Sequence, residues 1–194
     1  MPETGDAKLA QTPSQTVGPF FGYALPFAGG PELVPAASPG SIRLHGTVFD
    51  GAGDPVPDAI LEIWQADAAG VIPRRTGSLV RNGHDFTGFG RAPVDGEGRF
   101  SFSTVKPGAI DASAPFVLIT IFARGMLQHL FTRAYFGDEA EANAADAFLA
   151  SVDPTRRDTL IAAPDGPSSY AFDVRLQGDS ETIFLDYFAE ADDA

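Results

Sequence analysis

The sequence contains no cysteine, which excludes disulfide frameworks, thiolate metal sites and cysteine nucleophiles. It also lacks any uninterrupted apolar run of about 18 residues, and its start shows no basic segment followed by a hydrophobic stretch. We therefore expect neither a membrane span nor an export signal. A chain without cysteine suits a reducing compartment, so the cytoplasm is the expected location.

Basic residues are scarce: 13 Lys and Arg against 26 Asp and Glu give a formal net charge of −13. The resulting field repels phosphate backbones and anionic lipids, so neither nucleic acid nor a membrane surface is an expected partner. The same field repels small anions. An anionic substrate would need a cation placed close to it, which makes each arginine near a suspected pocket informative.

The sequence offers seven strand-like runs, usually separated by Gly, Pro or Asp, at residues 43–49, 59–65, 99–105, 116–124, 128–136, 170–177 and 182–188. Apolar and polar residues alternate at 100–103 and 172–176, which indicates strands with one buried face and one wet face. The run 116–123 is almost continuously hydrophobic and predicts a strand covered on both faces. The expected fold is all-β, a β-sandwich of two mostly antiparallel sheets.

One short helical excursion is expected near 138–151, where an acidic start precedes an alanine-rich stretch. Residues 1–40 are rich in Pro, Gly and Ala towards their end, and we expect an N-terminal arm and surface crossover there. Residues 41–194 contain no internal repeat and no linker between two cores. They are expected to form a single β-sandwich domain.

The three histidines, His45, His84 and His129, are far apart in the sequence, and none has a second histidine two or four residues away. We therefore expect no histidine metal site. His129 stands four residues before Arg133, a spacing that shares one face of a strand. No nucleophile elbow and no phosphate-binding loop is present.

Four segments occur in an informative order: Thr-Pro-Ser-Gln-Thr-Val-Gly-Pro-Phe at 12–20, Leu-Glu-Ile-Trp-Gln-Ala-Asp at 61–67, Gly-Arg-Phe to Lys-Pro-Gly at 98–108, and Thr-Arg-Ala-Tyr-Phe at 132–136. Together they resemble the intradiol ring-cleavage dioxygenases, in particular the protocatechuate 3,4-dioxygenase branch, from about residue 9 to residue 188. The resemblance implies a prealbumin-like β-sandwich. It also implies cleavage of 3,4-dihydroxybenzoate (protocatechuate) with O2 to 3-carboxy-cis,cis-muconate.

The family's iron site is absent from this sequence. The resemblance implies non-haem Fe(III) held by two tyrosinates and two histidines, and the matching positions carry Ile72, Ile110, Phe116 and Leu118. None of these side chains has a lone pair to give a metal, so we expect no metal on this chain. The resemblance instead implies an alpha-type chain, inactive alone, beside a homologous iron-binding beta subunit in a higher-order αβ oligomer. The four side chains are expected to be buried in place of the lost pocket.

The resemblance implies that this chain contributes substrate-binding residues to the rim of the partner's pocket: Arg133, Thr16, Gly18, Pro19 and Phe20. Many relatives carry tyrosine where this chain has Phe20. Arg133 would hold the substrate carboxylate, although an interface salt bridge is the competing interpretation. For the N-terminal segment, the competing interpretation is a flexible terminus.

Two other functions compete with this one. A non-catalytic transthyretin-like β-sandwich binding module shares strand patterns such as Gly-Thr-Val-Phe-Asp at 46–50. A self-sufficient catechol or hydroxyquinol dioxygenase would need iron ligands other than those of the family. Iron analysis of the purified chain separates all three hypotheses.

Overall fold

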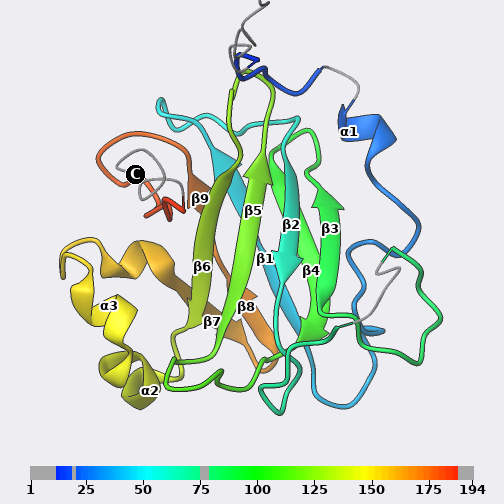
Figure 1. The fold of residues 1–194 in the computed structure, drawn as a ribbon, viewed down its shortest axis with the longest axis vertical. Helices are drawn as coiled ribbons and strands as arrows, with labels where there is room; N and C mark the ends of the chain where they lie inside the picture. The colour runs from blue at the N-terminus through cyan, green and yellow to red at the C-terminus, as the bar shows by residue number, and fades with distance from the viewer. Residues whose placement is uncertain (1–11, 19–20, 75–78, 188–194) are drawn as a thin grey trace, which may run out of the picture.

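The computed structural model describes residues 12–18, 21–74 and 79–187 (Figure 1). Short helices and turns connect a set of nine strands in the described part of the chain. The elements in chain order are α1 (Phe21–Ala24), β1 (Ser41–Phe49), β2 (Ile60–Trp64), β3 (Phe89–Pro93), β4 (Arg99–Val105), β5 (Phe116–Phe122), β6 (Leu130–Phe136), α2 (Ala140–Ala145), α3 (Ala147–Ser151), a 3-10 turn (Arg157–Leu160), β7 (Ile161–Gly166), β8 (Ser169–Ala171) and β9 (Val174–Arg175).

The strands follow one hydrogen-bonded path in the order β3-β2-β5-β6-β7-β8-β1-β4, with β9 beside β1. Figure 1 shows β6, β5, β2 and β3 in front of β8, β1 and β4. The two layers are continuous because β7 pairs with β6 on one side and with β8 on the other. The prediction of a mainly β fold is confirmed. The separation into two sheets is not, since the strands form one nearly closed, barrel-like sheet.

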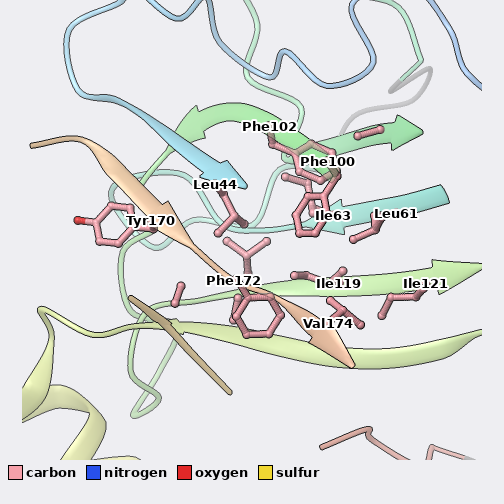
Figure 2. Close-up of a cluster of buried hydrophobic side chains, with 14 of the residues drawn as sticks. Leu44, Leu61, Ile63, Phe100, Phe102, Ile119, Ile121, Tyr170, Phe172 and Val174 are labelled. Atoms are coloured by element: carbon pink, nitrogen blue, oxygen red, sulfur yellow. The ribbon is translucent and has the colours of Figure 1, made fainter. Parts of the chain in front are cut away.

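The core lies between the two layers and is built from the inward faces of their strands. Along β1, the residues Ile42, Leu44, Gly46 and Val48 are buried while their neighbours are more exposed, as the two-residue period of a strand requires. Figure 2 shows how side chains from the facing layers meet, among them Leu44, Ile63, Phe102, Ile119 and Phe172. Each such side chain contributes about 1.5–3 kcal/mol when fully buried.

The strands predicted at 43–49, 59–65, 99–105, 116–124 and 128–136 are confirmed as β1, β2, β4, β5 and β6. The run 170–177 is divided into the short β8 and β9. The strand predicted at 182–188 is wrong for the residues described, 182–187. There only Leu185 makes a single bridge to Phe131, and Ile183 is held by a hydrogen bond from the Thr132 hydroxyl. Strands β3 and β7 were not predicted.

The helical excursion is confirmed, but it consists of two helices, α2 and α3, instead of one. The break falls at Asp146, whose carboxylate accepts a hydrogen bond from the Leu149 backbone N–H and so caps α3. No helix in the described ranges is long and apolar enough to cross a membrane.

The expectation that β5 is covered on both faces is confirmed on the core side, and cover of the other side by something outside the sheet, such as a subunit interface, stays a prediction. Val117, Ile119 and Ile121 point into the core and are fully buried. Phe116, Leu118 and Phe122 point to the other side, where this chain leaves them partly exposed. The outward side of β5 and its neighbours β2 and β6 therefore forms a sheet face that the described chain does not fully cover, and we call it the outer face.

Candidate functional site

The outer face brings the predicted site residue Arg133 next to two of the family's metal positions. Strands β5 and β6 are antiparallel, and their register sets Leu118 opposite Arg133 and Phe116 opposite Tyr135. Directly opposite residues lie on the same side of a sheet. The segments that matched the family at 132–136 and after Pro115 therefore converge on one patch.

Arg133 lies between two aromatic rings. Its guanidinium carbon is 4.4 Å from the centre of the Phe116 ring and 5.0 Å from that of Phe148, which belongs to α3. Its Nη1 donates a hydrogen bond to the Tyr135 hydroxyl at 3.1 Å. Its Nε is buried and has no hydrogen-bond partner within the described chain.

No acid among the described residues neutralises the charge of Arg133. Arg91 pairs with Glu62 on the same face, and Arg124 pairs with Asp58 at 3.1 Å. Arg133 makes no ion pair with any acid among the described residues. Burial lowers the pKa of Arg133, but the phenol oxygens of Tyr135 and Tyr187 outweigh this effect and raise the pKa above its ordinary value. The side chain is a permanent cation that makes no ion pair with a carboxylate in the described ranges.

Tyr135 links Arg133 to a buried carboxylate. Burial raises the pKa of the Tyr135 phenol, Arg133 lowers it, Asp146 raises it further, and the net pKa is above its ordinary value. The Asp146 side chain accepts hydrogen bonds from the backbone N–H groups of Leu149 and Ala114, both at 2.9 Å. Asp146 thereby ties the start of α3 to the segment just before β5, so that Phe148 and Phe116 are held close together.

The residues present do not fit the family's iron. Phe116 and Leu118 occupy neighbouring outward positions on β5, and neither offers a donor atom. Among the described residues, no group of three or more His, Cys, Asp or Glu is placed to hold a metal. No chemical step is therefore assigned to a metal on this chain.

The expectation that all four replaced positions are buried is wrong. Ile72 is 54% exposed, and Ile110, Phe116 and Leu118 are only partly buried. The reason is their location: two lie on the outer face and two lie in loops, and the described chain has no further layer to cover them. Burial of these side chains in the isolated chain is therefore incomplete.

The loops that carry Ile72 and Ile110 approach each other closely. The Gly108 backbone N–H donates to the Asp67 carbonyl at 2.8 Å, and the same carbonyl accepts from Gly70 at 3.0 Å. A β-carbon at Gly70 would collide with the Ala109 carbonyl oxygen. The fold thus holds side by side the two loops that carry Ile72 and Ile110, the positions that the resemblance matched to metal ligands.

The N-terminal segment lies at one end of the sheet, away from the middle of β6 (Figure 1). The Gly125 backbone N–H, in the β5–β6 loop, donates to the Thr16 hydroxyl at 2.8 Å. Gly18 accepts a hydrogen bond from Phe21 through its carbonyl. Pro19 and Phe20 lie outside the described residues. Within the described residues no contact joins Thr16 or Gly18 to Arg133, so the chain alone does not assemble all the predicted site residues.

The histidines have separate structural surroundings. His45 pairs with Asp165 at 2.8 Å on the far layer. His129 packs between the rings of Phe122 and Phe131. His45 and His129 therefore lie in different parts of the fold.

Phe148 and Asp146 were not singled out from the sequence. Phe148 reaches Arg133 from a helix, so no strand period links the two residues. Asp146 could have been found from the sequence, because an aspartate before Ala-Phe-Leu is a typical helix N-cap. An N-cap at this position would have divided the predicted helix correctly.

Comparison with known proteins agrees with this geometry. The sequence profile of the family described as Dioxygenase matches residues 18–178. The chain is 47% identical to the protocatechuate 3,4-dioxygenase alpha chain of Burkholderia cepacia, over 92% of this chain and 98% of that one. It is 32% identical to the beta chain of the same organism's enzyme, over 73% of this chain and 66% of that one.

Among solved structures, the dioxygenase domain of a carbohydrate-binding fusion protein from Streptomyces sp. SirexAA-E superposes with a TM-score of 0.57. That comparison has 26% identity and covers 87% of this chain and 99% of the other. The fold, the ordered sequence segments and the extent of these matches agree. The chain belongs to the intradiol dioxygenase family.

Proposed function

We propose that this chain is the alpha subunit of a protocatechuate 3,4-dioxygenase, active only in complex with a homologous beta subunit. The beta subunit would hold the non-haem Fe(III), and the complex would cleave 3,4-dihydroxybenzoate with O2 to 3-carboxy-cis,cis-muconate. The similarity to both an alpha chain and a beta chain supports this pairing. The complex is proposed to be cytoplasmic and to contain several αβ pairs.

The observation that carries the proposal is the combination found on the outer face. The ligand positions Phe116 and Leu118 have no donor atoms, while Arg133 beside them keeps a charge that no described acid neutralises. In a chain with a formal charge of −13, a half-buried cation of this kind is suited to an external carboxylate. The chain therefore has the means to bind an aromatic acid and not the means to oxidise it.

We assign substrate contacts to Arg133 and to the arm residues Thr16, Gly18, Pro19 and Phe20. The arm leaves the body of the molecule at the β5–β6 loop, where the hydrogen bond between Gly125 and Thr16 anchors it. The division into an arm of residues 1–40 and one domain of residues 41–194 is part of this proposal. Gly30 and Leu33 are fixed to the sheet, so the segment before them is proposed to reach a neighbouring subunit. Glycine and proline let a backbone pass close to a bound ring.

The test compares the chain purified alone with the chain co-expressed with a homologous chain that carries the two tyrosines and two histidines of the family's iron site. Iron is measured by mass spectrometry, and oxygen uptake is measured with protocatechuate. We expect no stoichiometric iron and no uptake for the chain alone, and both for the complex. The partner purified alone serves as the control. One ferric ion per isolated chain, with turnover, would overturn the proposal.

A further inference from the structure

The two rings around Arg133 come from different elements, the start of β5 and the start of α3. We propose that Phe116 and Phe148 are positioning residues, an aromatic clamp that holds the Arg133 guanidinium in one orientation for the substrate carboxylate. The inference rests on the proposed function, because it takes the carboxylate to be that of the aromatic acid. The proposal assigns a function to Phe116, which stands at a position that the resemblance matched to a metal ligand.

The distances support a clamp. A guanidinium stacks on aromatic faces within about 6 Å of the ring centre, and both rings satisfy this limit at 4.4 Å and 5.0 Å. Contact with two rings from opposite elements restricts the plane of the group more than either ring would alone. An arginine side chain otherwise has several rotatable bonds to order on binding.

The clamp is itself anchored on both sides. The Asp146 carboxylate receives one backbone N–H from α3 and one from the segment before β5, and it is only 1% exposed. The Phe116 ring also packs 5.6 Å from the Tyr135 ring, centre to centre. The two halves of the clamp therefore cannot separate without breaking buried hydrogen bonds.

The clamp leaves hydrogen-bonding capacity on the guanidinium. Arginine has five N–H donors, and in this chain Nη1 meets the Tyr135 hydroxyl while Nε meets no acceptor in the described residues. Nε is buried out of reach of an external carboxylate, so the N–H groups left for the substrate are those of the two Nη atoms. A pre-ordered cation with spare donors binds an anion with a smaller loss of conformational entropy.

The experiment uses the co-purified αβ complex and steady-state oxygen uptake with protocatechuate. Arg133→Ala should raise KM about 10- to 100-fold, the range of a charge-assisted contact. Phe148→Leu should raise KM about three- to tenfold with kcat within about twofold, and Phe148→Tyr, which keeps the ring, should restore KM. Phe116→Leu should act like Phe148→Leu. In the Arg133→Ala background, Phe148→Leu should add nothing further.

The matched control is Phe49→Leu, which removes the ring under Arg175 at 4.6 Å, a similar stack away from the outer face. Its KM should stay that of the parent complex. The clamp is overturned if Phe148→Leu raises KM equally with and without Arg133, or if it leaves KM unchanged while Arg133→Ala raises it. If Arg133→Ala itself leaves KM unchanged, the assignment of Arg133 to substrate fails, and the clamp with it.

Discussion

Gly70 occupies a position that no other residue type fits. Its φ of +80° lies in the left-handed region, and its Cα faces the Ala109 carbonyl across the two adjoining loops. A side chain would therefore meet two separate obstacles, the backbone conformation and the neighbouring loop.

Gly70→Ala should lower the free energy of unfolding by about 3 kcal/mol or more, because strain and collision with a backbone atom add together. The measurement is urea denaturation of the purified chain. Gly53→Ala is the control: its φ is +87° and a β-carbon there meets nothing within 4 Å, so only the conformational cost of about 1 kcal/mol applies. Equal losses for the two variants would contradict the close approach of the loops.

The sequence predicted the positions of some site residues better than those of others. Arg133 was predictable because it lies within a short motif and because cations are few. The exposure of Ile72 was not predictable, since an apolar side chain at a former ligand position is compatible with burial in this chain and with exposure on it. Only the path of the loop decides between the two. The substrate-binding roles predicted for Arg133 and for the N-terminal residues Thr16, Gly18, Pro19 and Phe20 remain predictions.

Among the secondary-structure elements, α3 has the most to do with the site, although it contains only Ala147–Ser151. A helix of this length is not stable by itself and depends on its cap and its packing. Its Leu149 packs in a buried cluster with Tyr135 and Leu160, and its Phe148 covers Arg133.

Asp146→Ala should lower the free energy of unfolding by about 2–4 kcal/mol. The cap of α3 is lost, and the buried N–H of Ala114 is left without an acceptor. Thermal or urea unfolding measures the change. Asp153→Ala provides the comparison, because Asp153 accepts only exposed hydrogen bonds from Thr155 and should cost less than about 1 kcal/mol. A loss of similar size in both variants would argue against the bridging role of Asp146.

The strands that sequence reasoning found are those with strong apolar runs or alternation. Strands β3 and β7 were not predicted because their sequences, Phe-Gly-Arg-Ala-Pro and Ile-Ala-Ala-Pro-Asp-Gly, contain glycine and proline. These residues usually indicate turns and not strands. Strand β3 is stabilised by pairing with β2, and β7 by pairing with β6 and with the adjacent β8. Residues 182–187 show the opposite case: their composition suits a strand, but side-chain hydrogen bonds take the place of a regular ladder.

A polar cluster outside the core joins the two layers of the molecule. Lys106 follows β4, Asp138 follows β6, and Tyr170 belongs to β8. The Lys106 ammonium contacts the Asp138 carboxylate at 2.9 Å and also pairs with Glu139, and the Tyr170 hydroxyl donates to Asp138 at 2.8 Å. The cluster thus joins strands from the front and the rear of the barrel-like sheet.

The pKa shifts of the cluster set the pH range of its contribution. Partial burial raises the pKa of Asp138, but the hydrogen bonds from Lys106 and Tyr170 outweigh it, and the net pKa is below its ordinary value. Burial lowers the pKa of Lys106, but Glu139 and Asp138 outweigh it, so the pKa is raised. Burial and Asp138 both raise the pKa of Tyr170, and Lys106 offsets only part of this.

The stabilisation from Asp138 is present above the ordinary carboxyl pKa of about 4 and is lost as the pH falls through its lower folded value. The stabilisation from Lys106 and Tyr170 is present below their ordinary pKa values of about 10 and is lost as the pH rises through the raised values. Lys106→Met should therefore destabilise the chain between about pH 5 and pH 9, and the difference from the parent should shrink beyond both limits.

Urea unfolding across this pH range measures the difference. Arg99→Met is the control, because Arg99 pairs with Asp95 and Glu97 on the open surface and should have little effect at any pH. A constant difference for Lys106→Met from acid to alkaline pH would show that the cluster acts through packing alone.

Strand β5 also has a consequence for how such a family can diversify. Its core residues Val117 and Ile119 alternate with Phe116 and Leu118, which point away from the core. The side chains at 116 and 118 can therefore change in chemical type, for example between metal donors and hydrocarbons, while the core residues of the strand stay the same. Two copies of one ancestral chain can in this way acquire different functions. One copy keeps the catalytic chemistry, and the other binds beside it and supports its site.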